Sequence, residues 1–334
     1  MKIFIQGITA VAILFLYSCS VPPKKVMFQG QAQGTYYAVT YFDGKGRNYQ
    51  PQIDSILKAF DLSVSMWSPG SIITRMNNGD TLVRADEWFA DIFRRSEAIA
   101  VSTDGAFDFT VGPLVNAWGF GFKGKIKMDD KKVDSLLQFV DFHKVSMDDR
   151  GFVSKPQGFR FDFNAIAQGY SVDVIGKFLV SRGIENYLVD IGGEVLGKGK
   201  KPDGSSWVVG IENPSTDSLS ERSLNARARL DDKALATSGN YRKYYEEDGI
   251  RYFHTIDPRT GYPVRHTLLS VSVLAGDCAT ADGYATAFMV MGFEKAKEFV
   301  EKRNDLEAYF ISSSADGLYQ TYETPGFKAI LENQ

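Results

Sequence analysis

Asp282 and Thr286 have the residue types and the spacing that suit metal chemistry. They lie four residues apart in Thr280-Ala-Asp-Gly-Tyr-Ala-Thr286, at the start of a predicted helix, and this spacing places both side-chain oxygens on one helix face, one turn apart. A carboxylate and a hydroxyl in this arrangement suit a hard cation such as Mg²⁺, which keeps positions open for substrate phosphates. The pair therefore indicates metal-assisted phosphate chemistry; the alternative is that both residues form a helix cap.

His254 is the candidate general base. It lies near Asp257 and Arg259, in a segment that turns at Pro258 and Gly261. A carboxylate and a guanidinium near the ring favour a role in catalysis. The alternative is a structural histidine whose hydrogen bonds are satisfied, which is the more common case for a lone histidine.

Two further segments are rich in glycine, acidic and aromatic residues. In the segment 104–121, the glycines let the backbone approach a ligand closely, and Phe107, Trp118 and Phe120 are placed to enclose a flat ring. The alternative there is a loop capped by core aromatics. Asp162 precedes a predicted helix. There it either caps the helix or forms a hydrogen bond to a ligand. The free amide groups at a helix N-terminus also favour the binding of phosphate.

The elements that must hold these residues are a mixture of helices and strands. Apolar residues recur at helical spacing within 53–60 and 88–99, and residues 165–182 also form a predicted helix that ends before Gly183. Strands are predicted at residues 36–42, 187–195, 207–211, 268–274 and 308–312. Because helices and strands do not alternate regularly, we expect an α+β fold with helices packed on largely antiparallel sheets. Neither a Gly-x-Gly-x-x-Gly dinucleotide motif after a strand nor a Walker lysine motif occurs.

The N-terminal segment resembles a targeting signal. Lys2 precedes an apolar run, residues 3–16, which is too short to span a membrane, since a spanning helix needs roughly 20 apolar residues. The run ends in Leu16-Tyr-Ser-Cys19, as in a bacterial lipoprotein signal, so we expect residues 1–18 to be removed and Cys19 to carry lipid. Ordinary signal cleavage is the alternative. Residues 19–29 would tether the rest of the chain, residues 30–334, to a membrane surface; its length allows one large domain or two.

The composition argues against several other classes of function. A formal net charge of −3 and the lack of a basic stripe argue against a nucleic-acid partner. Three histidines and two cysteines, widely scattered, argue against a His/Cys zinc site. If Cys19 carries lipid, Cys278 has no partner for a disulfide within the chain, so stability must come from the core.

Several motifs, in order, are similar to those of the ApbE family of flavin transferases. They are Thr103-Asp-Gly-Ala-Phe-Asp108, Gly112-Pro-Leu-Val-Asn-Ala-Trp-Gly119, Leu188-Val-Asp-Ile-Gly-Gly-Glu194, Ala236-Thr-Ser-Gly-Asn-Tyr241, His254-Thr-Ile-Asp-Pro-Arg-Thr-Gly261 and Ala281-Asp-Gly-Tyr-Ala-Thr286. The resemblance runs from Gly34 to about Gly292 and implies a single ApbE-like, T-fold-like catalytic unit.

The resemblance implies an FAD:protein FMN transferase. In such an enzyme FAD binds with Mg²⁺ on its pyrophosphate, a Ser or Thr hydroxyl of a target protein attacks the phosphorus on the FMN side, and AMP leaves. The expected targets are extracytoplasmic redox subunits, such as those of sodium-pumping NADH:quinone reductase or Rnf-type complexes. The alternatives are an FAD pyrophosphatase, in which water replaces the hydroxyl, and a non-catalytic flavin-binding lipoprotein.

The resemblance also implies roles for individual residues. Asp282 and Thr286 would ligate Mg²⁺ with their side chains and Ala165 with its backbone carbonyl, and His254 would act as the base. The residues expected to contact FAD are Gln33, Trp67, Ala106, Phe107, Asp108, Asp162, Gln168 and Ile256. Three of these depart from the family pattern: Gln33 replaces a common Met, Trp67 a usual Tyr, and Gln168 a frequent Lys that would give a phosphate a positive partner.

Overall fold

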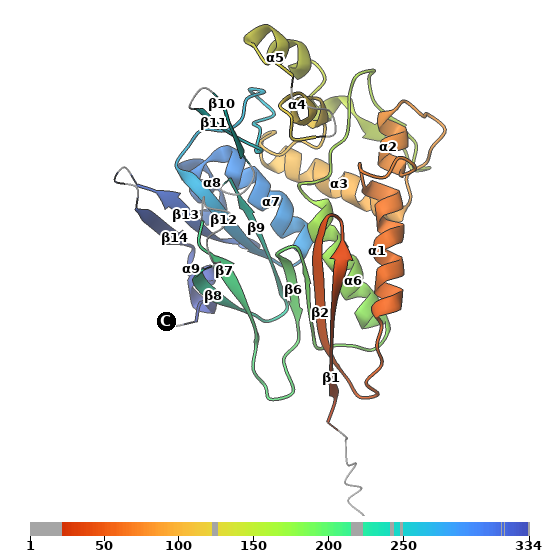
Figure 1. Ribbon diagram of the computed structural model, residues 1–334, viewed down its shortest axis with the longest axis vertical. Helices are drawn as coiled ribbons and strands as arrows, with labels where there is room; N and C mark the ends of the chain where they lie inside the picture. Colours follow the sequence, from red (N-terminus) through yellow and green to blue (C-terminus); the bar gives the residue numbers. More distant parts are fainter. Residues whose placement is uncertain are drawn as a thin grey trace, which may run out of the picture.

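An eight-stranded antiparallel sheet forms the centre of the fold (Figure 1). The computed structural model of the chain describes residues 22–121, 126–214, 223–240, 244–247, 250–314, 316 and 318–332. The strand order is β1-β2-β5-β6-β9-β12-β13-β14, and each neighbouring pair is antiparallel. The strands are β1 (Lys24–Ala32), β2 (Thr35–Asp43), β5 (Tyr187–Ile191), β6 (Glu194–Lys198), β9 (Lys233–Gly239), β12 (Leu268–Ala275), β13 (Glu307–Ser313) and β14 (Tyr319–Glu323).

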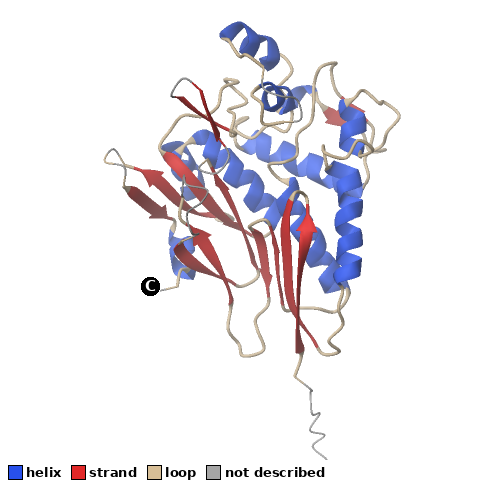
Figure 2. Cartoon of the chain, viewed as in Figure 1, coloured by secondary structure: helices blue, strands red, loops and turns tan. Residues whose placement is uncertain are grey.

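Helices cover one face of this sheet (Figure 2). They are α1 (Gln50–Val64), α3 (Glu87–Ser102), α6 (Ala167–Ser181), α7 (Cys278–Met291) and α8 (Phe293–Glu301). Alternation along each strand directs one set of side chains to the helices. In β12, Val271 and Val273 join the main core, whereas Leu274 joins a cluster on the opposite face. The predicted α+β fold, with helices on a largely antiparallel sheet, is confirmed.

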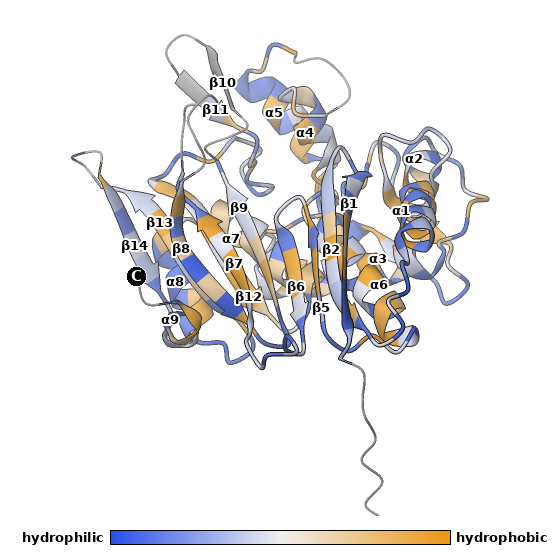
Figure 3. Cartoon of the chain, turned by 60° about the horizontal axis from the view of Figure 1, so that its bottom comes forward, coloured by the Kyte–Doolittle hydropathy of each residue, from blue (hydrophilic) through white to orange (hydrophobic). Residues whose placement is uncertain are grey.

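A two-stranded ribbon and a short helix cover part of the opposite face. β7 (Trp207–Glu212) pairs with β8 (Leu224–Leu230), and α9 (Pro325–Ile330) contacts β8 and β13. The apolar cluster on this face contains Val195, Trp207, Ile211, Ala228, Leu230, Leu235, Leu274, Tyr309, Ile311 and Phe327. Figure 3 shows β7 and β8 in front of the sheet and α7 and α8 behind it. The sheet is therefore covered on both faces at this end.

α7 is the central helix of the helical layer. It contacts β9, β12, α6 and α8, and its buried residues include Ala281, Asp282, Ala285 and Phe288. Because small and apolar residues of α7 itself are buried on nearly every side, the helix lacks the single apolar stripe of a surface helix. Asp282 is therefore held in the interior of the fold.

A smaller unit lies at one end of the molecule, at the top of Figure 1. It contains α4 (Gly112–Ala117), α5 (Asp130–Leu137) and the hairpin of β10 (Tyr244–Glu247) and β11 (Ile250–Phe253). Its apolar cluster consists of Leu114, Trp118, Val133, Val140 and Ile256. Short elements complete the described chain: α2 (Ile72–Asn77), a 3₁₀ helix (Phe142–Lys144), β3 (Ser146–Met147) and β4 (Val153–Ser154).

The structure agrees with most of the predicted segments and differs from two. The helices predicted at 53–60, 88–99 and 165–182 correspond to α1, α3 and α6, and strands predicted at 36–42, 207–211, 268–274 and 308–312 correspond to β2, β7, β12 and β13. The single strand predicted at 187–195 is wrong, because Gly192 and Gly193, with φ of 65° and 109°, turn the chain between β5 and β6. Residues 24–29 of the predicted tether lie in β1.

The predicted signal and Cys19 lie outside the described residues. In the part of the chain that the structure describes, no helix is both long enough and apolar enough to cross a membrane.

Candidate active site

Asp282 lies one turn into α7, with its carboxylate buried against the start of α6. The backbone N–H of Gly169 donates to Asp282 Oδ2 at 3.0 Å. Burial, with a further contribution from the charge of Asp173, raises the pKa of Asp282 to about 7. The capping alternative is wrong, because the N-cap of α7 is Asp277, which accepts from the N–H of Thr280 at 3.0 Å.

Glu194 supplies a second buried carboxylate in this region. It follows the β5–β6 turn, and burial together with the charge of Asp282 raises its pKa well above the ordinary range. The side-chain amide of Gln168 donates to Glu194 Oε2 and to the carbonyl of Ile191, the latter at 2.8 Å. Glu194 was not predicted as a site residue, because only its contacts with residues distant in sequence reveal its position.

Thr286 lies one turn after Asp282 on the same face of α7. Its hydroxyl oxygen is 3.3 Å from that of Ser238 at the end of β9. Ala165 is half-buried in the turn that precedes α6, four residues before Gly169. The N–H of Gly169 binds Asp282, so the predicted ligands on α7 and the segment that carries Ala165 meet at the start of α6.

These oxygen donors fit a hard cation. Asp282 offers a carboxylate, Thr286 a hydroxyl and Ala165 a carbonyl, which are ligands that Mg²⁺ accepts. Within the described residues, neither Asp282 nor Glu194 forms an ion pair with Lys or Arg, and the charge of Asp282 disfavours ionised Glu194. A bound cation would relieve this repulsion. Among the described residues, no group of three or more His, Cys, Asp or Glu side chains is arranged to hold a metal ion, so hydroxyl and carbonyl ligands would have to contribute.

Asp162 is a buried carboxylate in a turn, not a helix cap. It accepts from the N–H of Asn164 at 2.9 Å, whereas Ile166 occupies the N-cap position of α6, so the capping alternative is wrong. Burial raises the pKa of Asp162 to about 6. The N–H of Asp162 donates to the carbonyl of Phe109 at 2.8 Å, which places Asp162 next to the segment 106–108.

Ala106, Phe107 and Asp108 are all buried. The carboxylate of Asp108 accepts from the N–H and the hydroxyl of Thr110, at 2.7 and 2.6 Å, and from the N–H of Phe142 at 3.1 Å. Burial raises the pKa of Asp108 despite these hydrogen bonds. Phe107 lies in the main apolar core, which favours the core-aromatic alternative for this ring.

His254 and Ile256 belong to the smaller unit that contains α4 and α5. The ring of His254 is half-buried and meets the ring of Phe120 edge-on, with centroids 6.4 Å apart. Ile256 is buried in the apolar cluster of this unit. Asp257, three residues after His254, forms an ion pair with Arg259 at 2.8 Å, so this carboxylate has a partner of its own.

Gln33 and Trp67 differ in their environments. Gln33 lies in the β1–β2 turn with φ of 54°, and its Oε1 accepts from the hydroxyl of Ser171 at 3.3 Å. Its Nε2 is buried and has no hydrogen-bond partner within the described residues. A buried donor without a partner is costly, so a ligand acceptor would be favourable here. Trp67, between α1 and α2, is 65% exposed.

The structure gathers the predicted residues into groups. Hydrogen bonds connect Gln33 and Gln168 through Ser171, and Asp282 to Gly169, around the first turns of α6 and α7, while Ala165 precedes α6 in sequence and Thr286 lies one turn after Asp282 on α7. A second group joins the segment 106–108 to Asp162, and the loop 162–165 links these two groups in sequence. His254 and Ile256 form the third group, and Trp67 lies apart from all three.

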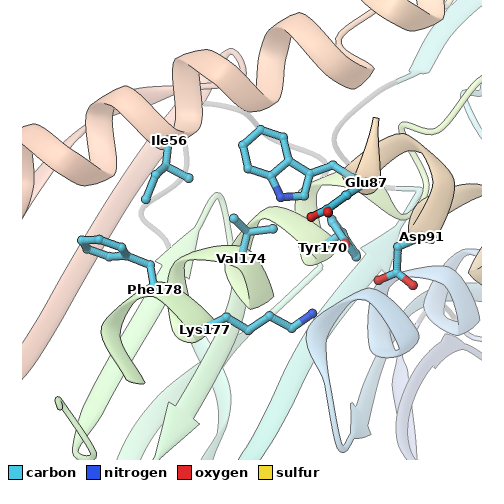
Figure 4. A pocket seen from close by; sticks show the side chains of 8 residues that line it. Ile56, Glu87, Asp91, Tyr170, Val174, Lys177 and Phe178 are labelled. Atoms are coloured by element: carbon cyan, nitrogen blue, oxygen red, sulfur yellow. The ribbon is translucent and has the colours of Figure 1, made fainter. Parts of the chain in front are cut away.

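Two surface pockets lie away from these groups. One, of about 530 Å³, lies between α1, α3 and α6 (Figure 4) and is lined by Ile56, Glu87, Trp88, Asp91, Tyr170, Val174, Lys177 and Phe178. The other, of about 600 Å³, is lined by residues 76–81, 83, 153 and 155–160. Neither lining includes a predicted site residue. The chemistry of the buried carboxylates, not the volume of a cavity, therefore locates the candidate site.

The fold and the site define an α+β protein with buried carboxylates where α6 and α7 pack together over an antiparallel sheet. A family model described as the ApbE family matches residues 33–310. The match covers most of the chain, and the chain belongs to the ApbE family. The resemblance of its motifs is therefore confirmed.

Related proteins match over nearly the full chain. The FAD:protein FMN transferase of Haemophilus influenzae is 35% identical over 350 residues, which cover 100% of both chains. The protein of the same name from Vibrio cholerae is also 35% identical, over 96% of this chain and 97% of the relative.

Solved structures support the same fold. The flavin transferase ApbE from Vibrio cholerae has a TM-score of 0.82 at 34% identity and covers 92% of this chain and 100% of its own. The apo form of the Pseudomonas stutzeri flavinyl transferase ApbE has a TM-score of 0.82 at 32% identity, over 93% of this chain and 98% of its own.

Proposed function

We propose that this chain is an FAD:protein FMN transferase that uses Mg²⁺. The names of its relatives support flavin transfer. The observation that carries the proposal for this chain is the buried carboxylate of Asp282. It lies one turn from Thr286 and close to the charge of Glu194, with no Lys or Arg ion pair among the described residues. Such a cluster suits a cation that binds a diphosphate.

In the proposed reaction, a Ser or Thr hydroxyl of a target protein attacks the phosphorus of FAD on the FMN side. A bond forms between the hydroxyl oxygen and this phosphorus, the bond from the phosphorus to the bridging oxygen breaks, and AMP leaves with the bridging oxygen. The target keeps FMN through a phosphoester. Catalysis of this kind depends mainly on positioning and electrostatics.

Each residue of the candidate site has a proposed role. Asp282, Thr286 and the carbonyl of Ala165 would hold Mg²⁺, which when bound spreads charge off the diphosphate and stabilises the leaving phosphate. His254 would accept the proton of the attacking hydroxyl. The proposed contacts with FAD are those of Gln33, whose Nε2 has no hydrogen-bond partner within the described residues, and of Trp67, Ala106, Phe107, Asp108, Asp162, Gln168 and Ile256.

The proposal extends to the place of action. Lipid on Cys19 would anchor the enzyme to a membrane with the catalytic unit in the periplasm. The targets would be extracytoplasmic redox subunits of sodium-pumping NADH:quinone reductase or Rnf-type complexes. The lipoprotein-like segment that ends at Cys19 motivates the proposed location.

The test is to incubate the purified chain with FAD and Mg²⁺, with and without an acceptor domain that can be flavinylated. AMP release is followed by chromatography and the acceptor by mass spectrometry. We expect the acceptor to gain FMN and AMP to accumulate in equal amount. Asp282→Ala should abolish this reaction, whereas Asp91→Ala, which removes a carboxylate of α3 outside the site, should retain it.

Three results would contradict the proposal in whole or in part. AMP and free FMN produced without acceptor, and at the same rate in its presence, would identify an FAD pyrophosphatase. FAD that is bound but stays intact in both mixtures, with each acceptor domain tested, would favour a non-catalytic flavin-binding protein. Full turnover by Asp282→Ala would remove the metal assignment while leaving the transfer reaction in place.

A further inference from the structure

α6 and α7 are joined by hydrogen bonds at two points, one helical turn apart. At the first, the N–H of Gly169 donates to the carboxylate of Asp282 at 3.0 Å. At the second, the carboxylate of Asp173 accepts from the N–H groups of Cys278 and Ala279, at 2.8 and 2.9 Å. Each helix therefore donates main-chain N–H groups to a carboxylate of the other.

Asp173 completes the N-terminus of α7. The first N–H groups of a helix have no acceptor within that helix. Asp277 accepts from Thr280 within α7, whereas Cys278 and Ala279 depend on Asp173, which comes from a different helix. Asp173 is only 6% exposed, so water could not easily replace its carboxylate.

The close approach of the two helices makes this contact sensitive to position. A Cβ atom at Gly169 would lie 2.3 Å from the carbonyl oxygen of Cys278 and 2.8 Å from the Cβ atom of Asp282. Both atoms belong to α7, so there is no room for α7 to move toward α6 here. The two hydrogen-bonded points therefore fix the position of α7 along the axis of α6 and the rotation of α7 about its own axis.

We propose that Asp173 is a positioning residue for the candidate metal site. By fixing the start of α7 on α6, it sets the distance from Asp282 and Thr286 to the carbonyl of Ala165, which precedes α6. Asp173 contacts neither metal nor FAD in this role and acts through the main chain of α7. The inference rests on the proposed function, because it requires a cation at these ligands.

The test is the affinity of the full chain for Mg²⁺ without FAD, measured by isothermal titration calorimetry for the wild type and Asp173→Asn. Asn is close to Asp in size, but it offers one acceptor oxygen and turns an NH₂ group toward the second main-chain N–H. We expect the dissociation constant for Mg²⁺ to rise about 10- to 100-fold, as when the residues that orient metal ligands are changed.

Asp277→Asn is the matched control. It removes one negative charge from the same helix N-terminus, including the ion pair of Asp277 with Arg95 at 3.0 Å, but Asn is as good an N-cap as Asp. Its affinity for Mg²⁺ should stay close to that of the wild type. An equal loss of affinity in this control would assign the effect to charge and overturn the positioning role.

Asp173→Glu keeps the negative charge that acts on Asp282, so a loss of Mg²⁺ affinity in this variant is due to position and not to charge, and it also answers the question if Asp173→Asn fails to fold. Glu keeps both acceptor oxygens but holds them one methylene further from α6, so α7 stays capped and is displaced. A folded variant of Asp173 that binds Mg²⁺ as tightly as the wild type would overturn this inference and leave the proposed function standing. A wild-type chain that does not bind Mg²⁺ would overturn both.

Discussion

The side-chain amide of Gln168 on α6 donates a hydrogen bond to the carboxylate of Glu194 on β6. The contact depends on Gly192, where a Cβ atom would lie 2.4 Å from Gln168 Nε2 and where φ is 65°, a conformation that favours glycine. Gln168 is therefore a neutral donor fixed between the β5–β6 turn and the start of α6, at a position where the resemblance leads us to expect Lys.

Gln168→Lys should strengthen FAD binding. A charged donor beside a diphosphate forms a stronger hydrogen bond than a neutral one, and Glu194 would keep the new ammonium in place. We expect the dissociation constant for FAD to fall about fivefold, which corresponds to about 1 kcal/mol of binding free energy. The measurement is flavin fluorescence at low ionic strength. Gln168→Met, which offers no donor, should bind FAD more weakly than the wild type. An unchanged affinity in both variants would exclude a contact with the diphosphate.

The stability of the metal-free protein should fall as the pH rises from the ordinary pKa of Asp282, 3.8, to the raised value of about 7. In this window the folded protein binds more protons than the unfolded chain, so raising the pH favours unfolding. Added Mg²⁺ should stabilise the protein more as the pH rises, because it binds the ionised carboxylate.

Asp282→Asn is the control for this pH dependence, since Asp162, Asp173 and Glu194 also have raised pKa values. The free energy of unfolding, measured with urea across this pH window, should change less steeply with pH for Asp282→Asn than for the wild type. It should also show no stabilisation by Mg²⁺. Equal slopes in the two proteins would mean that Asp282 stays ionised throughout.

His254→Ala should slow FMN transfer and leave FAD binding intact. A positioned base contributes about 100-fold or more to the rate, and the half-buried ring of His254 lies outside the group around Asp282. Single-turnover transfer and FAD affinity would be measured in parallel. His143→Ala, which changes an exposed histidine, should react as the wild type does. A wild-type rate for His254→Ala would end its candidacy as the base.

Trp67→Ala should weaken FAD binding without affecting the stability of the FAD-free protein. Because Trp67 is largely exposed, little packing is lost, whereas a stacked ring contributes about 0.5–1.5 kcal/mol beyond burial of its area. Titration with FAD and thermal unfolding would separate the two effects. Trp67→Phe, which keeps an aromatic face, should recover most of the affinity, and a failure to do so would argue against stacking.

Cys19→Ala should release the protein from membranes. Lipid on this residue would be the anchor, and the described helices provide no membrane-spanning segment. Membrane fractionation, with mass analysis of the mature N-terminus, would measure the change. Ser20→Ala is the neighbouring control and should remain in the membrane fraction. Continued membrane association of Cys19→Ala would count against a lipid at this position.

The sequence predicted the helices that have one apolar face and gave little information about the central one. α1 and α3 expose one side and show helical periodicity, so their positions follow from the pattern. α7 is buried on nearly all sides, and its run of small and apolar residues has no periodic stripe. Only the start of a helix near Asp282 was predictable there, and Asp282 proved to lie one turn inside it.

Turns and long-range contacts set the limit of prediction at the candidate site. The segment 187–195 is rich in strand-forming residues and was predicted as one strand, but Gly192 and Gly193 divide it into two strands. Asp162 precedes α6 in sequence, but the chain turns once more before the helix begins at Ala167. The roles of Glu194 and Asp173 depend on partners more than 20 residues away, which no local pattern specifies.

The missing side chain at Gly169 has a practical consequence for anyone who wishes to redesign this enzyme. A single methyl group there would act as a wedge between the two helices, since its nearest neighbours are a backbone oxygen and the Cβ atom of Asp282. The spacing between α6 and α7, and with it the distance between the proposed ligands on the two segments, thus depends on the absence of a carbon atom at Gly169. An attempt to make the proposed site accept a larger cation would begin at this glycine, a residue that has no functional group of its own.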